Sequence, residues 1–161
     1  MFLSGLTGYY QCRRCQVCSL NRCRARRTTD FASTVTSKSH TIEPFITCST
    51  EGVVYILECP CGLQYVGRTK RPLQVRLNEH INNIRNGYTK HSVSKHYLLK
   101  HKKDPTNTLF LGIDKYDRQW RGSDLVRSIS KLEMSWIHKV KCYTPFGLNI
   151  DVDVNCFIDN S

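Results

Sequence analysis

Residues 53–80 read VVYILECPCGLQYVGRTKRPLQVRLNEH, and this stretch gives the clearest indication of the fold. Two runs of β-branched and aromatic residues, 52–58 and 62–68, predict two β-strands. The short turn Cys59-Pro60-Cys61 between them predicts an antiparallel hairpin. With Pro60 at the centre of the turn, Tyr55 and Tyr65 would lie opposite each other on one face of the sheet.

A helix is predicted after the hairpin, because Pro72 suits a first helical turn. Apolar residues then recur at intervals of four, four and three and form one stripe: Leu73, Leu77, Ile81 and Ile84. Arg76 and His80 are one helical turn apart and lie beside this stripe. We therefore expect both side chains at the border of the core.

The remaining elements of the fold are predicted from periodicity in the second half of the chain. Residues 93–100 predict a short helix and residues 108–114 a third strand. A last helix is expected from Ser123, with Glu133 at the margin of an apolar stripe formed by Leu125, Ile129, Leu132, Trp136 and Val140. The order predicts a mixed α/β fold, in which a small three-stranded antiparallel sheet is flanked by helices.

The chain has 161 residues, a formal net charge of +11 and a pI near 9.4, which suits one domain that binds polyanions. Ten Lys or Arg and one acid lie between residues 65 and 103, whereas residues 142–161 contain three Asp and no Lys or Arg. This asymmetry favours a nucleic-acid-binding face. The alternative is a merely soluble basic surface.

Three features bear on the compartment. No stretch approaches the roughly 18 continuous apolar residues of a membrane span, and the first residues do not resemble a signal peptide. The nine cysteines are therefore interpreted as reduced thiols rather than a disulfide framework. We expect an intracellular protein, located in the nucleus, with no membrane association.

Changes of composition suggest three parts of the chain. Residues 1–44 comprise a Cys- and Arg-rich segment followed, at 28–43, by a Ser- and Thr-rich stretch typical of a linker. Residues 45–150 have the composition of a globular domain. Residues 151–161 form an acidic tail.

Several polar residues in the predicted domain suit phosphodiester hydrolysis, which needs an activated water, a proton acceptor, positive charge and usually a divalent metal. Tyr55 and Tyr65 could orient or deprotonate the water, and Arg76 could bind the phosphate. Glu133 could supply an oxygen ligand to Mg²⁺. Taken singly, each of these residues has an ordinary explanation in packing or surface charge.

Their order and spacing resemble the GIY-YIG endonuclease superfamily over residues 46–149. The elements that carry the resemblance are Val53-Val54-Tyr55, Tyr65-Val66-Gly67, Arg76, His80, Glu133 and Asn149. Val53-Val54 replaces Gly-Ile, a change that concerns backbone packing more than chemistry. The resemblance implies a DNA endonuclease that nicks or cleaves DNA with Mg²⁺ or Mn²⁺.

The resemblance also implies catalytic roles for individual residues. Tyr55 would be the general base, with His80 left open as an alternative, and Tyr65 would position the water. Arg76 would bind the phosphate, Glu133 the metal, and Asn149 would close the domain. The neighbouring cations Arg68, Lys70 and Arg71 would contact the DNA backbone and make binding salt-sensitive.

Within the superfamily, the phrases CPCGLQYVGRTKR, RLNEH, SVSKHYLLKH and PFGLN are similar to the nuclease segment of Penelope-like retroelements. In such elements a reverse transcriptase precedes the nuclease. The similarity therefore implies a retroelement origin and, as a partner, a reverse transcriptase encoded elsewhere or lost.

Two sets of residues have the spacing of zinc ligands. Cys12, Cys15 and Cys18 are each separated by two residues, and Cys23 or Cys48 could complete a tetrahedral site. Cys59 and Cys61 form a second candidate with His96 and His101, and similar Cys/His sets are implied for the retroelement nucleases. The alternatives are a reduced, disordered tail and, for the second set, a turn with two DNA-facing histidines.

The sequence therefore favours a Mg²⁺-dependent DNA endonuclease. A catalytically decayed, zinc-containing nucleic-acid-binding module is the main alternative, although the retention of Tyr55, Tyr65, Arg76 and Glu133 speaks against decay. A protein-interaction module that uses the cysteine-rich segment is a third hypothesis, with only composition to support it.

Overall fold

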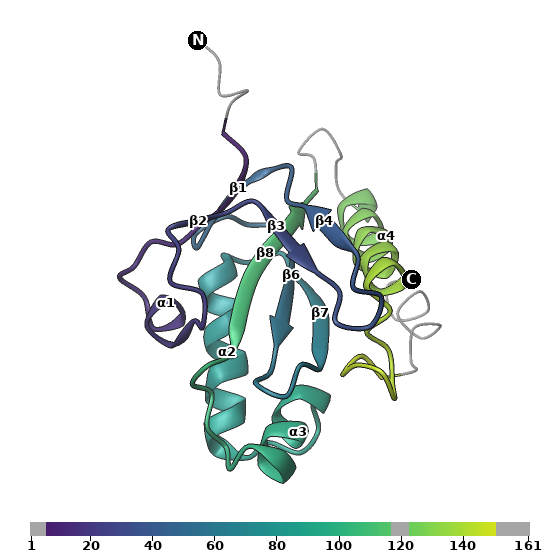
Figure 1. The fold of residues 1–161 in the computed structure, drawn as a ribbon. Helices are drawn as coiled ribbons and strands as arrows, with labels where there is room; N and C mark the ends of the chain where they lie inside the picture. Colours follow the sequence, from purple (N-terminus) through teal and green to yellow (C-terminus); the bar gives the residue numbers. More distant parts are fainter. Residues whose placement is uncertain (1–5, 117–122, 151–161) are drawn as a thin grey trace.

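A computed structural model describes residues 6–116 and 123–150 (Figure 1). The acidic tail expected at 151–161 lies outside the described residues. The elements, in chain order, are β1 (Gly8–Tyr10), α1 (Gln16–Leu20), β2 (Arg27–Thr28), β3 (Asp30–Ala32), β4 (Ser39–Thr41), β5 (Phe45–Thr47), β6 (Val53–Glu58), β7 (Gln64–Thr69), α2 (Leu73–Asn86), α3 (Ser92–Lys100), β8 (Leu109–Lys115) and α4 (Ser123–Val140).

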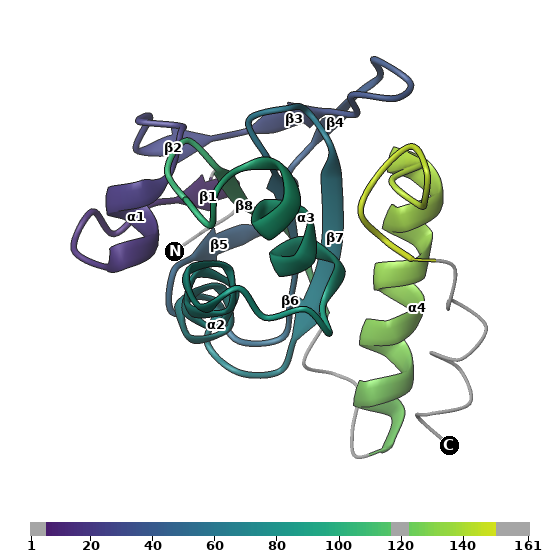
Figure 2. The ribbon, with the colours of Figure 1, turned by 90° about the horizontal axis from the view of Figure 1, so that it is seen from below.

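The central sheet has the strand order β7-β6-β8, and both strand pairs are antiparallel. Helices α2 and α3 lie on one side of this sheet and α4 on the other, as seen from below (Figure 2). The predicted three-stranded antiparallel sheet flanked by helices is thus confirmed. None of the helices in the described ranges is long and apolar enough to span a membrane.

The hairpin between β6 and β7 differs from the prediction by its register. Tyr55 pairs with Gly67, and Tyr65 pairs with Leu57, so the two tyrosines share a face but are diagonal neighbours. The expectation that they lie directly opposite each other was therefore wrong. The ladder ends at the pair of Glu58 and Gln64, so the five-residue connection 59–63 is centred on Cys61, one residue past Pro60, and it contains Gly62 with a φ of 97°.

Helix α2 packs as its periodicity predicted. Its apolar stripe is fully buried: Leu73, Leu77, Ile81 and Ile84. His80 is also buried, with 1% of its surface exposed, whereas Arg76 is partly exposed. The helix ends at Gly87, whose left-handed conformation is typical of a helix C-terminus. The burial of this face fixes how Arg76 and His80 point toward the sheet.

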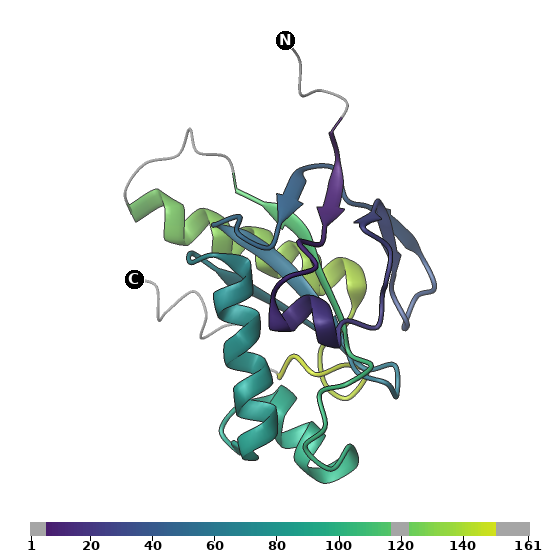
Figure 3. The same cartoon turned by 90° about the vertical axis from the view of Figure 1, so that its left-hand side faces the viewer.

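The N-terminal part of the chain forms a second layer, which faces the viewer in Figure 3. Strand β1 pairs with β2 and β5, and it packs against β8. The Ser- and Thr-rich stretch expected to be a linker contains the β3–β4 hairpin. Phe31 and Ile42 anchor this stretch in the same hydrophobic core as the central sheet. The many Ser and Thr residues around them made the stretch look like a linker in the sequence.

Two asparagines bind the outer strands of the sheet. The carboxamide of Asn21 bonds to the main-chain N–H and C=O of Phe110 on β8, at 3.1 and 2.9 Å. The carboxamide of Asn149 bonds in the same way to Val66 on β7, with both distances 2.9 Å. Both asparagines are buried, and each replaces part of the hydrogen bonding that a further strand would provide.

Candidate active site

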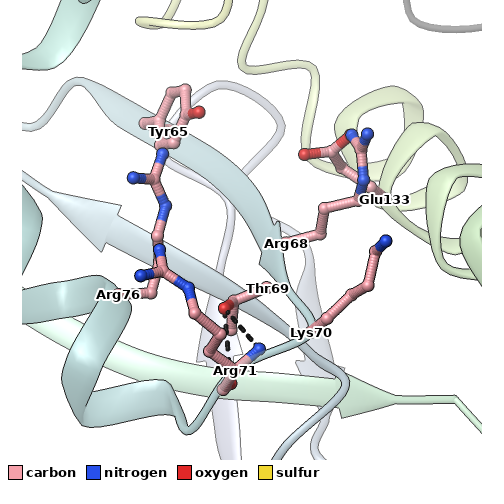
Figure 4. Close-up of a pocket in the computed structure, with 7 residues that line it drawn as sticks. All are labelled: Tyr65, Arg68, Thr69, Lys70, Arg71, Arg76 and Glu133. Atoms are coloured by element: carbon pink, nitrogen blue, oxygen red, sulfur yellow. Dashed lines mark hydrogen bonds and ion pairs between the residues drawn. The ribbon is translucent and has the colours of Figure 1, made fainter. Parts of the chain in front are cut away.

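A cavity of about 530 Å³ lies beside the end of β7, between α2 and α4 (Figure 4). Its lining consists of Tyr65, Arg68, Thr69, Lys70, Arg71, Arg76 and Glu133. Four of these seven residues are cations, and Glu133 is the one carboxylate among them. The cavity is therefore suited to an anionic group such as a phosphate.

Behind the cavity, Tyr55 connects α2 to the sheet. Its hydroxyl lies 2.8 Å from Nε2 of His80 and accepts a hydrogen bond from Nε of Arg76 at 3.2 Å. Tyr55 is fully buried and is not part of the cavity lining. Gly67 is required opposite it, because a Cβ at this position would collide with the phenol.

Burial sets the protonation states of this pair. Loss of solvent raises the pKa of Tyr55 to about 12, so the phenol keeps its proton at neutral pH. Burial, together with the nearby Arg76 and His91, lowers the pKa of His80 well below its ordinary value. His80 is therefore a neutral imidazole, and the arrangement lets the Tyr55 hydroxyl donate to its Nε2.

Tyr65 faces the cavity and packs against a pair of histidines. Its ring centre lies 5.6 Å from that of His80 and 5.2 Å from that of His91. Nδ1 of His91 accepts a hydrogen bond from the Val93 main chain at the start of α3. Burial and the charge of Arg76 lower the pKa of His91 to about 4. No role is predicted for His91 from the sequence, and its position as the N-cap of α3 becomes evident only in the structure.

Glu133 points from α4 into the cavity and is 6% exposed. Its Oε1 accepts a hydrogen bond from Arg68 on β7 at 2.7 Å. The carboxylate thus faces the same cavity as Arg76, which comes from the helix on the opposite side of the sheet edge. The structure brings together the predicted anion-binding and metal-binding residues.

Glu79 is a second carboxylate near the site, and no role is predicted for it from the sequence. It bonds to both terminal nitrogens of Arg71, at 2.6 and 2.7 Å, and to Arg76 at 2.9 Å. The hydrogen bonds from Arg71 are the main reason why the pKa of Glu79 falls to about 2. Glu79 therefore holds two guanidinium groups side by side at the cavity wall.

The structure places Asn149 away from the cavity. Both ends of its carboxamide are occupied by the Val66 main chain, and the Cys142 thiol lies 3.0 Å from its Oδ1. It does not line the cavity. Its position fits the closing role implied by the resemblance better than contact with substrate.

Both predicted cysteine clusters come together in space. The sulfurs of Cys12, Cys15, Cys18 and Cys48 lie within 4.8 Å of one another. Cys23 is not in this group, and its sulfur lies near Thr28 instead. Of the two alternatives for the fourth position, the geometry thus favours Cys48.

The second cluster joins the β6–β7 hairpin to α3. The ligand atoms of Cys59, Cys61, His96 and His101 also lie within 4.8 Å of one another. Nε2 of His96 lies 3.2 Å from the Cys61 sulfur and 3.5 Å from that of Cys59. Nε2 of His101 is buried and has no hydrogen-bond partner among the described residues. Such an unpaired nitrogen suits a metal ligand.

Comparison with known families gives one match: a model of the GIY-YIG catalytic domain matches residues 51–145. The matched range contains the whole central sheet, α2, α3, α4 and all seven residues of the cavity lining. Neither the curated proteins nor the solved structures gave a match.

Proposed function

The chain belongs to the GIY-YIG family of nucleases, and we propose that it is an endonuclease that nicks DNA in a reaction that requires Mg²⁺ or Mn²⁺. The observation that carries this proposal is the convergence of Arg76 and Glu133 on one cation-rich cavity. The basic residues around the cavity support a polyanionic substrate.

GIY-YIG nucleases use a divalent metal, and the cavity offers a fitting donor. Mg²⁺ is commonly held by one or two carboxylates together with substrate phosphate and water, and Glu133 is a buried carboxylate that faces the cavity. Glu133 is paired with Arg68 in this structure, so it would hold the ion once Arg68 turns to a flanking phosphate, and the ion would supply Lewis-acid stabilisation of the phosphate charge.

Side chains of the protein would bind the phosphate, orient the water and accept its proton. Arg76 binds a non-bridging oxygen of the phosphate with its planar guanidinium, and Tyr65 orients the attacking water. The Tyr55 hydroxyl is buried behind Arg76 and outside the cavity lining, so it would reach this water only after Arg76 has moved; it would then accept the proton while its own proton passes to Nε2 of the neutral His80. This step requires Arg76 to turn from Tyr55 toward the phosphate, because its Nε–H is donated to the Tyr55 hydroxyl in this structure. Arg68, Lys70 and Arg71 bind flanking phosphates.

The test is conversion of supercoiled plasmid to nicked circle with Mg²⁺. Glu133→Gln and Arg76→Ala should each abolish nicking. The matched controls Glu51→Gln and Arg85→Ala change exposed residues outside the cavity and should nick normally. Nicking that survives in Glu133→Gln and Arg76→Ala would overturn the assignment of the site.

The second candidate function is a decayed, zinc-containing nucleic-acid-binding module. The two metal-type clusters favour it, and both are proposed to hold Zn²⁺ in either case. Plasmid binding without nicking, unchanged by Glu133→Gln, would support this module in place of the enzyme.

We also propose a retroelement origin, with a reverse transcriptase as partner and the nucleus as the compartment. The support is the similarity of residues 59–71 and 145–149 to Penelope-like nucleases, whereas the family match extends only to the GIY-YIG domain. Co-purification of the tagged protein with a reverse transcriptase from nuclear extract would test the partner.

A further inference from the structure

The cluster of Cys12, Cys15, Cys18 and Cys48 has the dimensions of a zinc tetrathiolate. The Cys18 sulfur lies 3.5 Å from those of Cys15 and Cys48 and 3.8 Å from that of Cys12. Zinc–sulfur bonds of about 2.3 Å give a tetrahedron with edges of about 3.8 Å. The three distances from Cys18 match these edges, and all four sulfurs lie within 4.8 Å of one another, so their spacing is close to that of such a site.

Groups around the cluster suit the charge of bound thiolates. The main-chain N–H groups of Cys12 and Arg14 point at the sulfurs of Cys48 and Cys12, each at 3.4 Å. The Tyr9 hydroxyl lies 3.5 Å from the Cys48 sulfur. Such donors orient metal ligands and stabilise their negative charge.

Cys48 also contacts the catalytic helix directly. Its main-chain oxygen accepts a hydrogen bond from the Gln74 N–H at 2.8 Å, and the oxygen of Thr50 accepts one from the Leu73 N–H at 2.9 Å. Leu73 and Gln74 begin α2, whose first N–H groups have no partner inside the helix. Pro72, which precedes them, provides no side-chain cap.

Cys48 thus links the cluster to α2: its sulfur belongs to the cluster, and its carbonyl oxygen bonds to the first turn of the helix. Arg76 follows Gln74 by two residues on this helix, and His80 lies one turn further. The position of the 47–50 turn therefore sets where α2 begins and how Arg76 reaches the cavity.

We propose that zinc bound by Cys12, Cys15, Cys18 and Cys48 holds the first turn of α2 in place and so positions Arg76 for cleavage. The effect on cleavage rests on the proposed nuclease function, whereas the effect on the helix does not. Zinc is thereby a positioning element, distinct from the divalent metal that Glu133 would hold for the reaction itself.

The first test is independent of activity. Zinc content and amide hydrogen exchange are compared in the wild-type chain, Cys12→Ser and the control Cys23→Ser, whose cysteine lies outside the cluster. Cys12 is exposed, and its hydrogen bonds go to Cys48, Cys18 and Arg14 rather than to α2, so we expect its replacement to act through the metal. Cys12→Ser should bind one zinc fewer per chain and exchange faster at Leu73 and Gln74, with β6 unchanged as the internal reference.

Unchanged exchange at Leu73 and Gln74 despite loss of zinc would overturn the proposal, as would equal zinc contents in Cys12→Ser and Cys23→Ser. If Cys12→Ser unfolds, titration of zinc into metal-free wild-type protein gives the same comparison. Protection at these two amides should then rise with zinc and not with Mg²⁺.

The second test uses nicking and a double-mutant cycle. Cys12→Ser should lower kcat by about 10- to 100-fold with little change in DNA affinity, because a small displacement of Arg76 affects the chemical step most. In the Arg76→Lys background the same change should cost much less, since both substitutions act on one interaction. Equal losses in both backgrounds would refute action through Arg76. A wild-type chain that does not nick would refute the nuclease function, and the exchange result would still decide the role of zinc in α2.

Discussion

Replacement of Asn149 by alanine separates a structural from a catalytic role for this residue. The substitution removes the two hydrogen bonds to Val66 and leaves a buried N–H and C=O without their partner. An unsatisfied buried group costs about 1–3 kcal/mol, and water that enters the space recovers part of this. We expect the free energy of unfolding to fall by about 2–4 kcal/mol.

For a chain of this size, each kcal/mol lowers the Tm by about 2–4 °C, so Asn149→Ala should melt roughly 4–16 °C lower. Thermal unfolding measures the loss, with Asn82→Ala on the exposed face of α2 as the control. Plasmid nicking well below the Tm should proceed at a rate close to wild type. Wild-type stability combined with lost nicking would refute this reasoning and place Asn149 in the chemistry.

Four further predictions, from three substitutions, concern the cavity and the residues behind it. Glu79→Gln should tighten DNA binding, because Arg71 and Arg76 lose their internal counter-ion. The slope of log K against log salt concentration should become steeper by about one to two. Equilibrium binding at several salt concentrations measures both effects. Since the pKa of Glu79 falls from 4.5 to about 2 on folding, the unfolded chain binds more protons between these values. Its contribution to stability is thus present above pH 4.5 and lost as the pH falls toward 2, and acid titration of Glu79→Gln should lack this component. Gly67→Ala should cost about 1–3 kcal/mol in urea unfolding, because the added methyl group displaces the Tyr55 phenol. Tyr55→Phe should destabilise by about 1–3 kcal/mol and abolish nicking; a stable, active variant would exclude Tyr55 as part of the base.

The central elements could be predicted because their patterns are long and regular. The apolar stripe of α2 and the β-branched runs of β6 and β7 give strong periodic signals. The register of the hairpin could not be predicted, because it depends on one left-handed glycine, Gly62, rather than on any run of residues.

The N-terminal layer and parts of the site gave weaker signals. Strands of two or three residues, such as β1 to β5, are too short to show periodicity. Glu79 acts through Arg71 and Arg76, eight and three residues away, and His91 caps α3, but composition alone does not reveal which local side chains will bond to each other. The motif residues that face the cavity are Tyr65, Arg76 and Glu133, on β7, α2 and α4, and they were identified by their resemblance to the GIY-YIG pattern rather than by periodicity.

The matching asparagines at the two outer strands have a consequence for self-association. A small sheet with open edges can recruit a strand from a second molecule, which leads to aggregation. Here Asn21 occupies the N–H and C=O of Phe110 on β8, and Asn149 occupies those of Val66 on β7. Each side-chain amide takes the place of a neighbouring peptide group, so at one position on each edge a strand from a second molecule would first have to displace the chain's own asparagine, which disfavours growth into a larger assembly.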